Sequence, residues 1–163
     1  MAISNDDLLF MRISDEVRQH SHDPHRQVGA VIVDSEGIVI ATGSNHPPSV
    51  LEITADDSRA AILEDPSWKY FMLEHAERNA IYDAFRQYVN LTGTTMYTTL
   101  FPCADCARAI VAAGITRLVV PSRQKASERD AKWSEHYRFA RQIFEAAGVQ
   151  LDEVLFDVSV NLK

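Results

Sequence analysis

Apolar side chains repeat at helical spacing in several parts of the chain. After Ser4 and an acidic first turn, Leu9, Ile13 and Val17 form one such stripe. Gly148 follows another helical stretch, and glycine commonly ends helices. The predicted helices are residues 6–19, residues 74–89 with Ala80, Ala84 and Tyr88 on one stripe, residues 103–113 followed by Gly114, and residues 129–147 with Trp133, Tyr137, Ala140 and Phe144 on one face.

Runs of β-branched residues predict the strands. Residues 28–44 contain two such runs joined by a turn at residues 34–37, which indicates an antiparallel hairpin. Residues 94–100, 116–121 and 149–156 predict further strands that alternate with the helices. This order implies an α/β protein, a three-layer α/β/α sandwich around a five-stranded mixed sheet.

The segment between the hairpin and the next long helix has no clear periodicity. Residues 46–70 contain Pro47, Pro48 and Pro66 and mix polar with apolar residues, so we expect an irregular excursion with room for a short helix. Connections of this length are often functional. The rest of the chain holds no repeat, linker or low-complexity tract, and its length suits one domain over residues 1–163.

The balance of charge narrows the possible partners. The chain carries 23 acidic and 16 basic residues, for a net charge of -7. This charge repels polyanions, so nucleic acid and anionic membranes are disfavoured, whereas a small anionic substrate still suits a locally basic pocket. The first residues lack a basic region followed by a long apolar run, and no apolar stretch approaches bilayer length. We therefore expect a cytoplasmic protein without membrane contact.

The chain's two cysteines, Cys103 and Cys106, open a predicted helix directly after a predicted strand. A structural disulfide would be rare in a reducing cytosol. Pro102 precedes the pair, and the unpaired amides and dipole of a helix start favour thiolates. Both side chains lie on one face of the first turn, which suits a redox dithiol and a metal equally.

His75 and Glu77 also lie at the start of a predicted helix. Two helix starts can converge at one end of a sheet, and one imidazole with two thiolates makes a three-ligand zinc set whose fourth position stays open for water. Bound zinc lowers the pKa of its water, and a nearby carboxylate can take that proton. A thioredoxin-like redox pair would leave the His-Ala-Glu spacing unexplained, and a structural zinc site is normally closed by four ligands.

These residues resemble the signature of the zinc-dependent cytidine and deoxycytidylate deaminase superfamily, a His-x-Glu followed by Pro-Cys-x-x-Cys. The matching residues are His75-Ala76-Glu77 and the stretch from Pro102 to Cys106. The likeness is strongest to deoxycytidylate (dCMP) deaminases and covers most of residues 23–151, in the stretches DPHRQVGAVIV, HAERNAI, LFPCADCARAIVAAGI and FARQIFEAAGVQL.

The resemblance implies a cytidine deaminase-like fold and hydrolytic deamination of a cytosine nucleotide, from dCMP to dUMP with release of ammonia. It implies one Zn2+ per chain, held by His75, Cys103 and Cys106, with Glu77 as the proton shuttle. It also implies a small nucleotide or nucleoside as substrate and a homo-oligomer, either a dimer or a larger assembly.

Substrate contacts follow from the same resemblance. Ala76 would present its backbone amide to the base carbonyl, and Asn45 would hydrogen-bond the sugar. An asparagine at position 45 can also simply cap the turn behind its strand. The remaining candidates are Val28 and Phe101 in the pocket wall, Trp133 and Tyr137 either in the packing of the last helix or stacked on the base, and Arg26, Arg123 and Lys125 as phosphate contacts.

The likeness fails at the end of the second strand. Residues 43–48 read Gly-Ser-Asn-His-Pro-Pro, where dCMP deaminases usually have Gly-Tyr-Asn-Gly-x-Pro. That stretch shapes the sugar and phosphate end of the pocket, so cytidine, guanine or a related ring stays an alternative substrate. A redox or structural-zinc protein is the other alternative, which the intact Glu77 disfavours. His20, His22 and His25 either bind a second metal or lie in a solvated loop.

Overall fold

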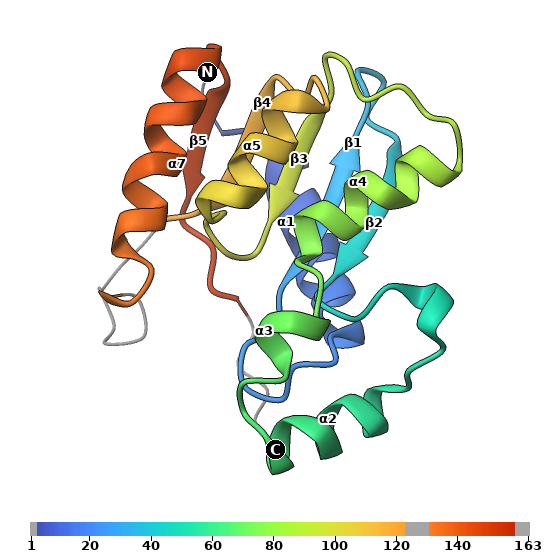
Figure 1. Cartoon of the computed structure of the whole chain (residues 1–163). Helices are drawn as coiled ribbons and strands as arrows, with labels where there is room; N and C mark the ends of the chain where they lie inside the picture. Colours follow the sequence, from blue (N-terminus) through green and yellow to red (C-terminus); the bar gives the residue numbers. More distant parts are fainter. Residues whose placement is uncertain (1–2, 123–130, 159–163) are drawn as a thin grey trace.

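The structure of the chain, a computed structural model, describes residues 3–122 and 131–158. Helices and strands alternate along most of its length (Figure 1). In chain order the elements are α1 (Asn5–Val17), β1 (Gly29–Val33), β2 (Val39–Ser44), α2 (Ala55–Glu64), α3 (Lys69–Met72), α4 (Ala76–Arg86), β3 (Thr95–Thr98), α5 (Ala104–Ala112), β4 (Arg117–Pro121), α7 (Ser134–Ala147) and β5 (Gln150–Val154), with short 3-10 turns at Arg18–His20 and Ser49–Leu51.

The strands form one mixed sheet in the order β2-β1-β3-β4-β5. β1 pairs antiparallel with both β2 and β3, whereas β4 pairs in parallel with both β3 and β5. The hairpin of β1 and β2 turns at Asp34, whose carboxylate accepts the backbone N–H groups of Glu36 and Ile38 at 2.9 Å each. The predicted five-stranded mixed sheet and its opening antiparallel hairpin are therefore confirmed.

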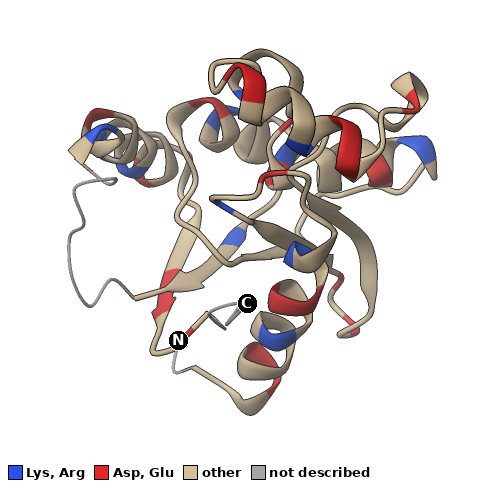
Figure 2. Ribbon diagram, turned by 90° about the horizontal axis from the view of Figure 1, so that it is seen from below, with Lys and Arg blue, Asp and Glu red and all other residues tan. Residues whose placement is uncertain are grey.

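Helices cover both faces of the sheet, so the predicted three-layer sandwich is also confirmed (Figures 1 and 2). Alternate residues of a strand point to opposite faces, and in β1 Val31 belongs to the core under α1 while Ile32 belongs to the core under α4, α5 and α7. The core under α4, α5 and α7 is the larger of the two, and Phe144 of α7 is among its fully buried residues. Figure 2 shows both signs of charge spread over the helices.

The face that α1 turns toward the sheet differs from the predicted stripe. Leu9 is 50% exposed, and Ile13 and Val17 pack only at the edge of the core. Phe10 and Met11 are the apolar residues of α1 that are buried. The helix exists where the sequence predicts it, but the predicted contact face was wrong by about one residue along the helix.

A close backbone contact with β1 explains the orientation of α1. A Cβ atom at Gly29 would lie 2.1 Å from the Ser14 carbonyl oxygen, so only glycine lets the helix lie against the strand there. The Ser14 hydroxyl also donates to the Tyr97 carbonyl of β3 at 3.2 Å. A polar residue therefore sits at the centre of the contact face, which the apolar spacing of the helix could not indicate.

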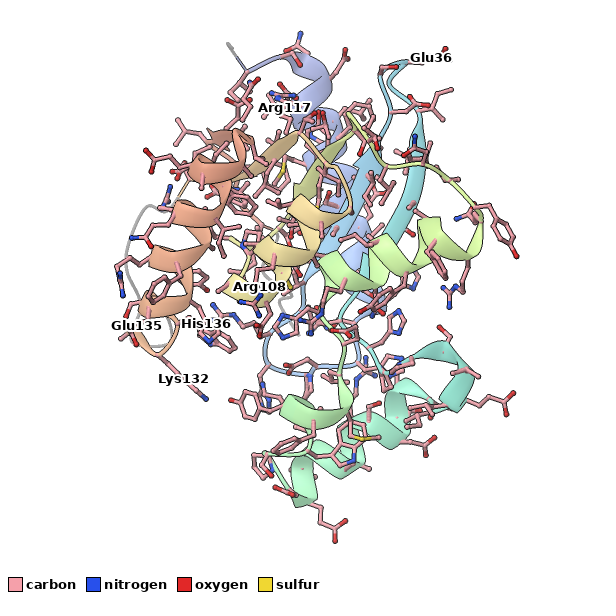
Figure 3. The ribbon with its side chains drawn as sticks, turned by 45° about the horizontal axis from the view of Figure 1, so that its top comes forward. Glu36, Arg108, Arg117, Lys132, Glu135 and His136 are labelled. Carbon is pink, nitrogen blue, oxygen red and sulfur yellow. The ribbon has the colours of Figure 1, made fainter. Side chains whose placement is uncertain are left out.

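A buried ion-pair cluster joins α1 to the sheet. The Arg117 guanidinium donates to Asp7 at 2.7 and 3.1 Å and to Asp152 at 2.7 Å, and the Tyr97 hydroxyl donates to Asp7 at 2.7 Å. Burial alone would raise the pKa of Asp7, but hydrogen bonds from Arg117, Ser4 and Tyr97 outweigh it and hold that pKa well below its ordinary value. Arg117 lies beside α1 in Figure 3, at the end of the sheet away from α3.

The 46–70 segment is more regular than the sequence indicates. It holds the second 3-10 turn and the whole of α2, which begins with a capping box between Thr54 and Asp57. His22 Nδ1 lies 2.8 Å from the Ser58 hydroxyl on α2, and an isolated bridge pairs His46 with Glu74. These contacts anchor the excursion beside the start of α4.

The other helices occupy their predicted regions. Tyr88 is 97% exposed rather than on the apolar stripe, because α4 ends at Arg86 and Tyr88 itself takes a positive φ. Tyr137, Ala140 and Phe144 are buried on one face of α7 as predicted, and residues 129–130 lie outside the described part of the chain. Within residues 3–122 and 131–158, no helix has the length and apolar character needed to cross a membrane.

Candidate active site

Two helices begin side by side at the end of the sheet where β3 stops. His75 is the N-cap residue of α4 and Cys103 is the N-cap residue of α5, both with extended backbone. The Glu74 carboxylate accepts the backbone N–H of His75 at 2.9 Å. Pro102 precedes Cys103 and so stands just outside α5 rather than in its first turn. The predicted convergence of the two motif helices is present.

Gly43 determines how closely α4 approaches the sheet. A Cβ atom at this position would lie 2.2 Å from the Ala76 carbonyl oxygen and 2.4 Å from the Ala80 nitrogen. The first turn of α4 can therefore rest directly on β2 only because residue 43 has no side chain. The Asn79 side chain donates to the Ser44 carbonyl at 2.8 Å and fastens the same contact.

The two helix starts bring three metal-binding atoms together. His75 Nδ1 lies 3.5 Å from Cys103 Sγ and 3.4 Å from Cys106 Sγ, and the three ligand atoms all lie within 4.8 Å of one another. In a tetrahedral zinc site, nitrogen and sulfur ligands stand roughly 3.5 Å apart. The spacing and the donor set, one imidazole and two thiols, therefore both fit zinc.

The cluster distributes its protons unequally. Hydrogen bonds from Cys106 and His75 lower the pKa of Cys103 to about 4, although burial opposes the shift. The contact with Cys103, together with burial, raises the pKa of Cys106. The contact with Cys103 also raises the pKa of His75. Cys103 is thus a thiolate that faces two proton donors, and a bound metal would take the place of those protons.

Glu77 is a buried carboxyl in the first turn of α4, with 4% of its surface exposed. Burial raises its pKa, Cys103 adds to the rise, and the cationic form of His75 opposes it. A carboxyl whose pKa is raised in this way can accept a proton and return it within one reaction. Its place beside the cluster is the one expected from the sequence.

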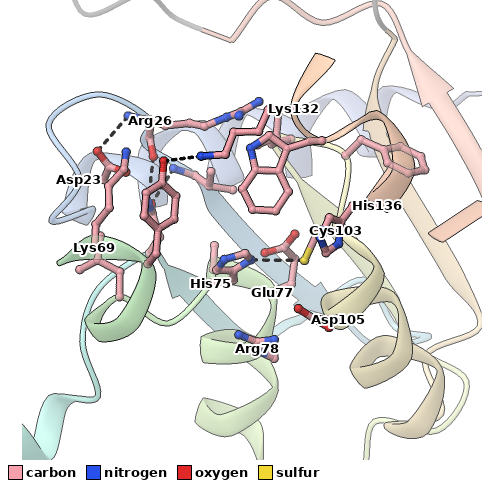
Figure 4. Close-up of a pocket in the computed structure, with 18 of the residues that line it drawn as sticks. Asp23, Arg26, Lys69, His75, Glu77, Arg78, Cys103, Asp105, Lys132 and His136 are labelled. Carbon is pink, nitrogen blue, oxygen red and sulfur yellow. Dashed lines mark hydrogen bonds and ion pairs between the residues drawn. The ribbon is translucent and has the colours of Figure 1, made fainter. Parts of the chain in front are cut away.

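A cavity of about 620 Å3 opens onto the cluster. Figure 4 shows His75, Glu77 and Cys103 at its base, with Arg26 on one side and His136 on the other. The predicted contacts that line it are Arg26, Val28, Asn45, Ala76, Phe101, Trp133 and Tyr137. The other two predicted phosphate contacts, Arg123 and Lys125, lie outside the described residues.

Asn45 holds the wall of this cavity in place. Its Oδ1 accepts the Val28 backbone N–H at 2.8 Å, and its Nδ2 donates to the Arg26 carbonyl at 2.8 Å. The residue is buried and fastens residues 26–28 to the end of β2. Asn45 therefore has a clear structural role in addition to its place in the cavity lining.

Phe101 and Tyr137 line the cavity from within the core. Both are buried, and their rings pack edge to face with centroids 5.6 Å apart. The Arg141 guanidinium lies 4.5 Å above the Phe101 ring, and Phe144 packs edge-on against it. Arg26 donates to the Tyr137 hydroxyl at 3.4 Å. Phe101 is only 6% exposed, so little of its ring faces the cavity.

Several lining residues carried no motif that sequence reasoning could use. Lys69 pairs with the buried Asp23 at 2.9 Å, and Lys132 donates to the Tyr70 hydroxyl at 3.0 Å. Lys69 and Tyr70 belong to α3, which directly precedes the His75 motif along the chain, whereas Lys132 comes near it only through folding. The one shared signal is a lysine directly before an aromatic residue, and that pair is too common to identify a site. The remaining lining residues not predicted are His25, Leu73, Arg78, Leu100, Asp105 and His136.

The histidines near residue 20 do not assemble into a second metal site. Among the described residues, the groups that could hold a metal are His75 with both cysteines and a set of Cys103, Asp105 and His136 that shares Cys103. His22 contacts Ser58 and the His46 ring instead. Within the described residues, His20, His22 and His25 therefore form no shared ligand group.

A three-ligand metal set with an adjacent buried carboxyl defines a class of hydrolytic metalloenzymes that act on small substrates in a closed cavity. Residues 4–122 match the family model described as the cytidine and deoxycytidylate deaminase zinc-binding region. The chain therefore belongs to this family of zinc-dependent hydrolytic deaminases. The family resemblance noted in the sequence is confirmed.

Known relatives resemble the chain over most of its length. A deoxycytidylate deaminase of Homo sapiens is 34% identical over 140 residues, which cover 86% of this chain and 74% of the relative. An uncharacterized deaminase of Aliivibrio fischeri is 31% identical over 149 residues, with 91% and 93% covered. The crystal structure of the cyanophage S-TIM5 dCMP deaminase with dCMP and dUMP superposes with a TM-score of 0.69 at 20% identity and covers 94% of this chain and 100% of that one, which supports the fold.

Proposed function

We propose that this chain deaminates dCMP to dUMP and ammonia in a zinc-dependent hydrolysis. The observation that carries the proposal is the buried carboxyl of Glu77 beside the cluster of His75, Cys103 and Cys106, at the base of a cavity. A closed structural zinc site would have no use for such a carboxyl. The match to deoxycytidylate deaminases over most of the chain supports the choice of substrate.

His75, Cys103 and Cys106 would hold one Zn2+ per chain. Their spacing and their donor atoms support this assignment. When bound, zinc lowers the pKa of its water toward neutrality and polarises the substrate. Burial opposes the cationic form of Arg78, but its hydrogen bond to Glu74 and the nearby Cys106 and Cys103 outweigh burial and raise its pKa. This cation partly offsets the negative charge of the two thiolates.

Glu77 would move the protons of the reaction. It takes a proton from the attacking water and passes it to the ring nitrogen next to the carbon that carries the amine. It then transfers the second water proton to the departing amine, so the carbon–nitrogen bond breaks, ammonia leaves and a carbonyl remains. Amides in the first turn of a helix have no intrahelical partner, so the Ala76 N–H is available to hold the base carbonyl.

The cavity is suited to an anionic substrate despite the acidic balance of the whole chain. Arg26, Lys69, Arg78 and Lys132 line it, against the carboxyl groups of Asp23, Glu77 and Asp105. Lys69 is already paired with Asp23. Lys132 is engaged by the Tyr70 hydroxyl. We assign Arg26, which the sequence also indicates and which lines the cavity, as the candidate contact of the substrate phosphate.

The assembly and the compartment are part of the proposal. Large apolar side chains are exposed on α3 and at the end of α4, with Phe71 84% and Phe85 76% exposed, and this supports a homo-oligomer. Light scattering at micromolar concentration should give the mass of a dimer or larger, and Phe71→Ser with Phe85→Ser should lower it. A monomeric wild type would contradict the proposed assembly.

The cysteines bear on the compartment. Both are free thiols, which suits the cytoplasm.

Ammonia release tests the reaction. Zinc-loaded protein is assayed with matched concentrations of dCMP, CMP, deoxycytidine, cytidine, cytosine and guanine, and Glu77→Gln serves as the blank. We expect a clear preference for dCMP. Turnover of guanine or another ring with none of dCMP would replace the proposed substrate. Turnover that survives in Glu77→Gln would contradict the role of Glu77.

Zinc content tests the ligand set independently of activity. Elemental analysis should find about one zinc per wild-type chain, and Cys106→Ala should lose most of it. His20→Ala is the matched control, since His20 is exposed and belongs to none of the candidate metal groups among the described residues. Full zinc retention in Cys106→Ala would show that the ligands lie elsewhere.

A further inference from the structure

The aromatic side chains that line the cavity differ in how much of each ring is free. Phe101 and Tyr137 are buried and packed against each other, and Tyr70 is engaged by Lys132. Trp133 is half-buried at the N-cap of α7, where it packs partly against the core and also lines the cavity. Its indole ring is therefore the aromatic surface most available to a molecule inside the cavity.

Trp133 stands next to the reacting end of the site. Its ring centroid lies 6.4 Å from that of His75, with the planes at 67°. It also packs against the His136 ring, whose centroid lies 5.1 Å away. Among the residues that the structure describes, none accepts a hydrogen bond from the indole N–H of Trp133. A buried indole N–H usually has a partner, so a half-buried one at a cavity wall is free to bind a ligand.

The neighbouring residue holds this wall in position. Lys132 Nζ donates to the Tyr70 hydroxyl at 3.0 Å and lies 4.3 Å above the Tyr70 ring. Tyr70 belongs to α3 and Lys132 directly precedes Trp133, so the contact bridges the excursion and the start of α7. Figure 4 marks this contact of Lys132 with a dashed line. Both partners are exposed, so we expect the contact to orient the wall more than to stabilise the fold.

We propose that Trp133 is a substrate-binding residue of this site: its indole packs against the aminated ring beside His75, and the contact between Tyr70 and Lys132 positions it. The proposal rests on the proposed deaminase function and deepens it. Its chemical basis is general, since aromatic side chains bind nucleobases by stacking whatever the base. The ligand class is a planar nitrogen ring.

Tryptophan fluorescence provides a direct test of binding. The chain holds two tryptophans, and Trp68 is not in the cavity lining, so Trp68→Phe leaves Trp133 as the sole reporter. In Trp68→Phe with Glu77→Gln, which blocks turnover, we expect dCMP and deoxycytidine to change the emission saturably and 2-deoxyribose 5-phosphate to leave it unchanged. The matched control, Trp133→Phe with Glu77→Gln, keeps Trp68 and should show no change.

Kinetics test whether the contact determines recognition. Trp133→Leu should raise the KM for dCMP roughly tenfold or more, as the loss of one base–aromatic stack does, with kcat changed less. Trp133→Phe should keep most of the affinity, because it retains an aromatic face. Trp68→Leu should leave KM and kcat unchanged. Zinc content and circular dichroism of each variant separate recognition from a structural role.

Each outcome decides the proposal. An unchanged KM in Trp133→Leu with zinc retained would overturn the proposal. It would also be overturned if no ring tested changes the tryptophan emission while equilibrium dialysis shows that the ring binds. If Trp133→Leu does not fold, the fluorescence titration decides alone. If the enzyme deaminates guanine and not dCMP, the proposed substrate fails, and the same titration with guanine decides the role of Trp133. If no ring binds at all, both proposals fail together.

Discussion

Asp7 and Glu77 are both buried carboxyls, and they lie on opposite faces of the same sheet. Asp7 faces a guanidinium and two hydroxyl groups, which hold its pKa below the ordinary value. Glu77 faces a thiolate in a buried setting, and its pKa is raised. Burial is thus common to a structural and a chemical role. The neighbours of the carboxyl decide which of the two roles it has.

The largest effect we expect is on turnover. Glu77→Gln should reduce the kcat for dCMP by at least about 100-fold, because the amide cannot carry the protons of the reaction. Circular dichroism and zinc content should stay as in the wild type. Asp7→Asn is the matched control on the other face of the sheet and should keep kcat in the folded protein. An equal loss of kcat in the two variants would contradict the division into a structural and a chemical carboxyl.

The next effect is on stability. Arg117→Met should lower the free energy of unfolding by about 3–5 kcal/mol, since it leaves the charge of Asp7 buried without its partner. Urea unfolding measures the change. Arg86→Gln removes an exposed ion pair with Asp83 and should cost less than about 1 kcal/mol. If the two variants lose equal stability, the buried cluster is not the support of α1 that we infer.

A smaller effect should appear in the dependence of stability on pH. The pKa of Asp7 is lowered on folding, so its contribution is present above the unfolded value near 3.9 and is lost as pH falls through the folded value. We expect Asp7→Asn to be less stable than the wild type by about 1–3 kcal/mol at pH 7, and the difference to shrink below pH 4. A difference that is constant from pH 7 to pH 2 would show that charge is not its cause.

The smallest effect has the opposite sign. The pKa of Glu77 is raised on folding, so ionisation of Glu77 destabilises the fold as pH rises. In the presence of a zinc chelator, Glu77→Gln should therefore gain about 0.5–2 kcal/mol at pH 7, a gain that disappears in acid. Thermal melts at pH 4 and pH 7 measure it. A variant that is less stable than the wild type at both pH values would place Glu77 among the structural carboxyls.

Local chemistry made much of the site predictable from sequence. His75, Glu77 and Cys103 lie at or next to helix starts, and a helix start leaves signals within a few residues. Their convergence also followed, because the α/β order limits where helix starts can meet. The sheet could be predicted for the same reason, from runs of β-branched residues and the turn at residues 34–37.

The remaining features depend on contacts between distant segments. The orientation of α1 is determined by Ser14 against Gly29, two small residues whose effect appears only when the helix meets the strand. Trp133 fits an apolar helix stripe, and only the placement of α7 shows that it both packs partly against the core and lines the cavity. Lys132 meets Tyr70 across a long sequence separation, for which a single chain offers no signal.

Gly43 extends the deaminase signature beyond its ligands. The contact of its Cα with the first turn of α4 fixes the depth of His75 relative to the cysteines of α5, so one missing methyl group aligns the two halves of the metal centre. An engineer who transplants the His-Ala-Glu and Pro-Cys-x-x-Cys segments into another scaffold would need to bring this glycine as well. Without this glycine, the ligands would be present in the right order, but His75 would not lie level with the two cysteines.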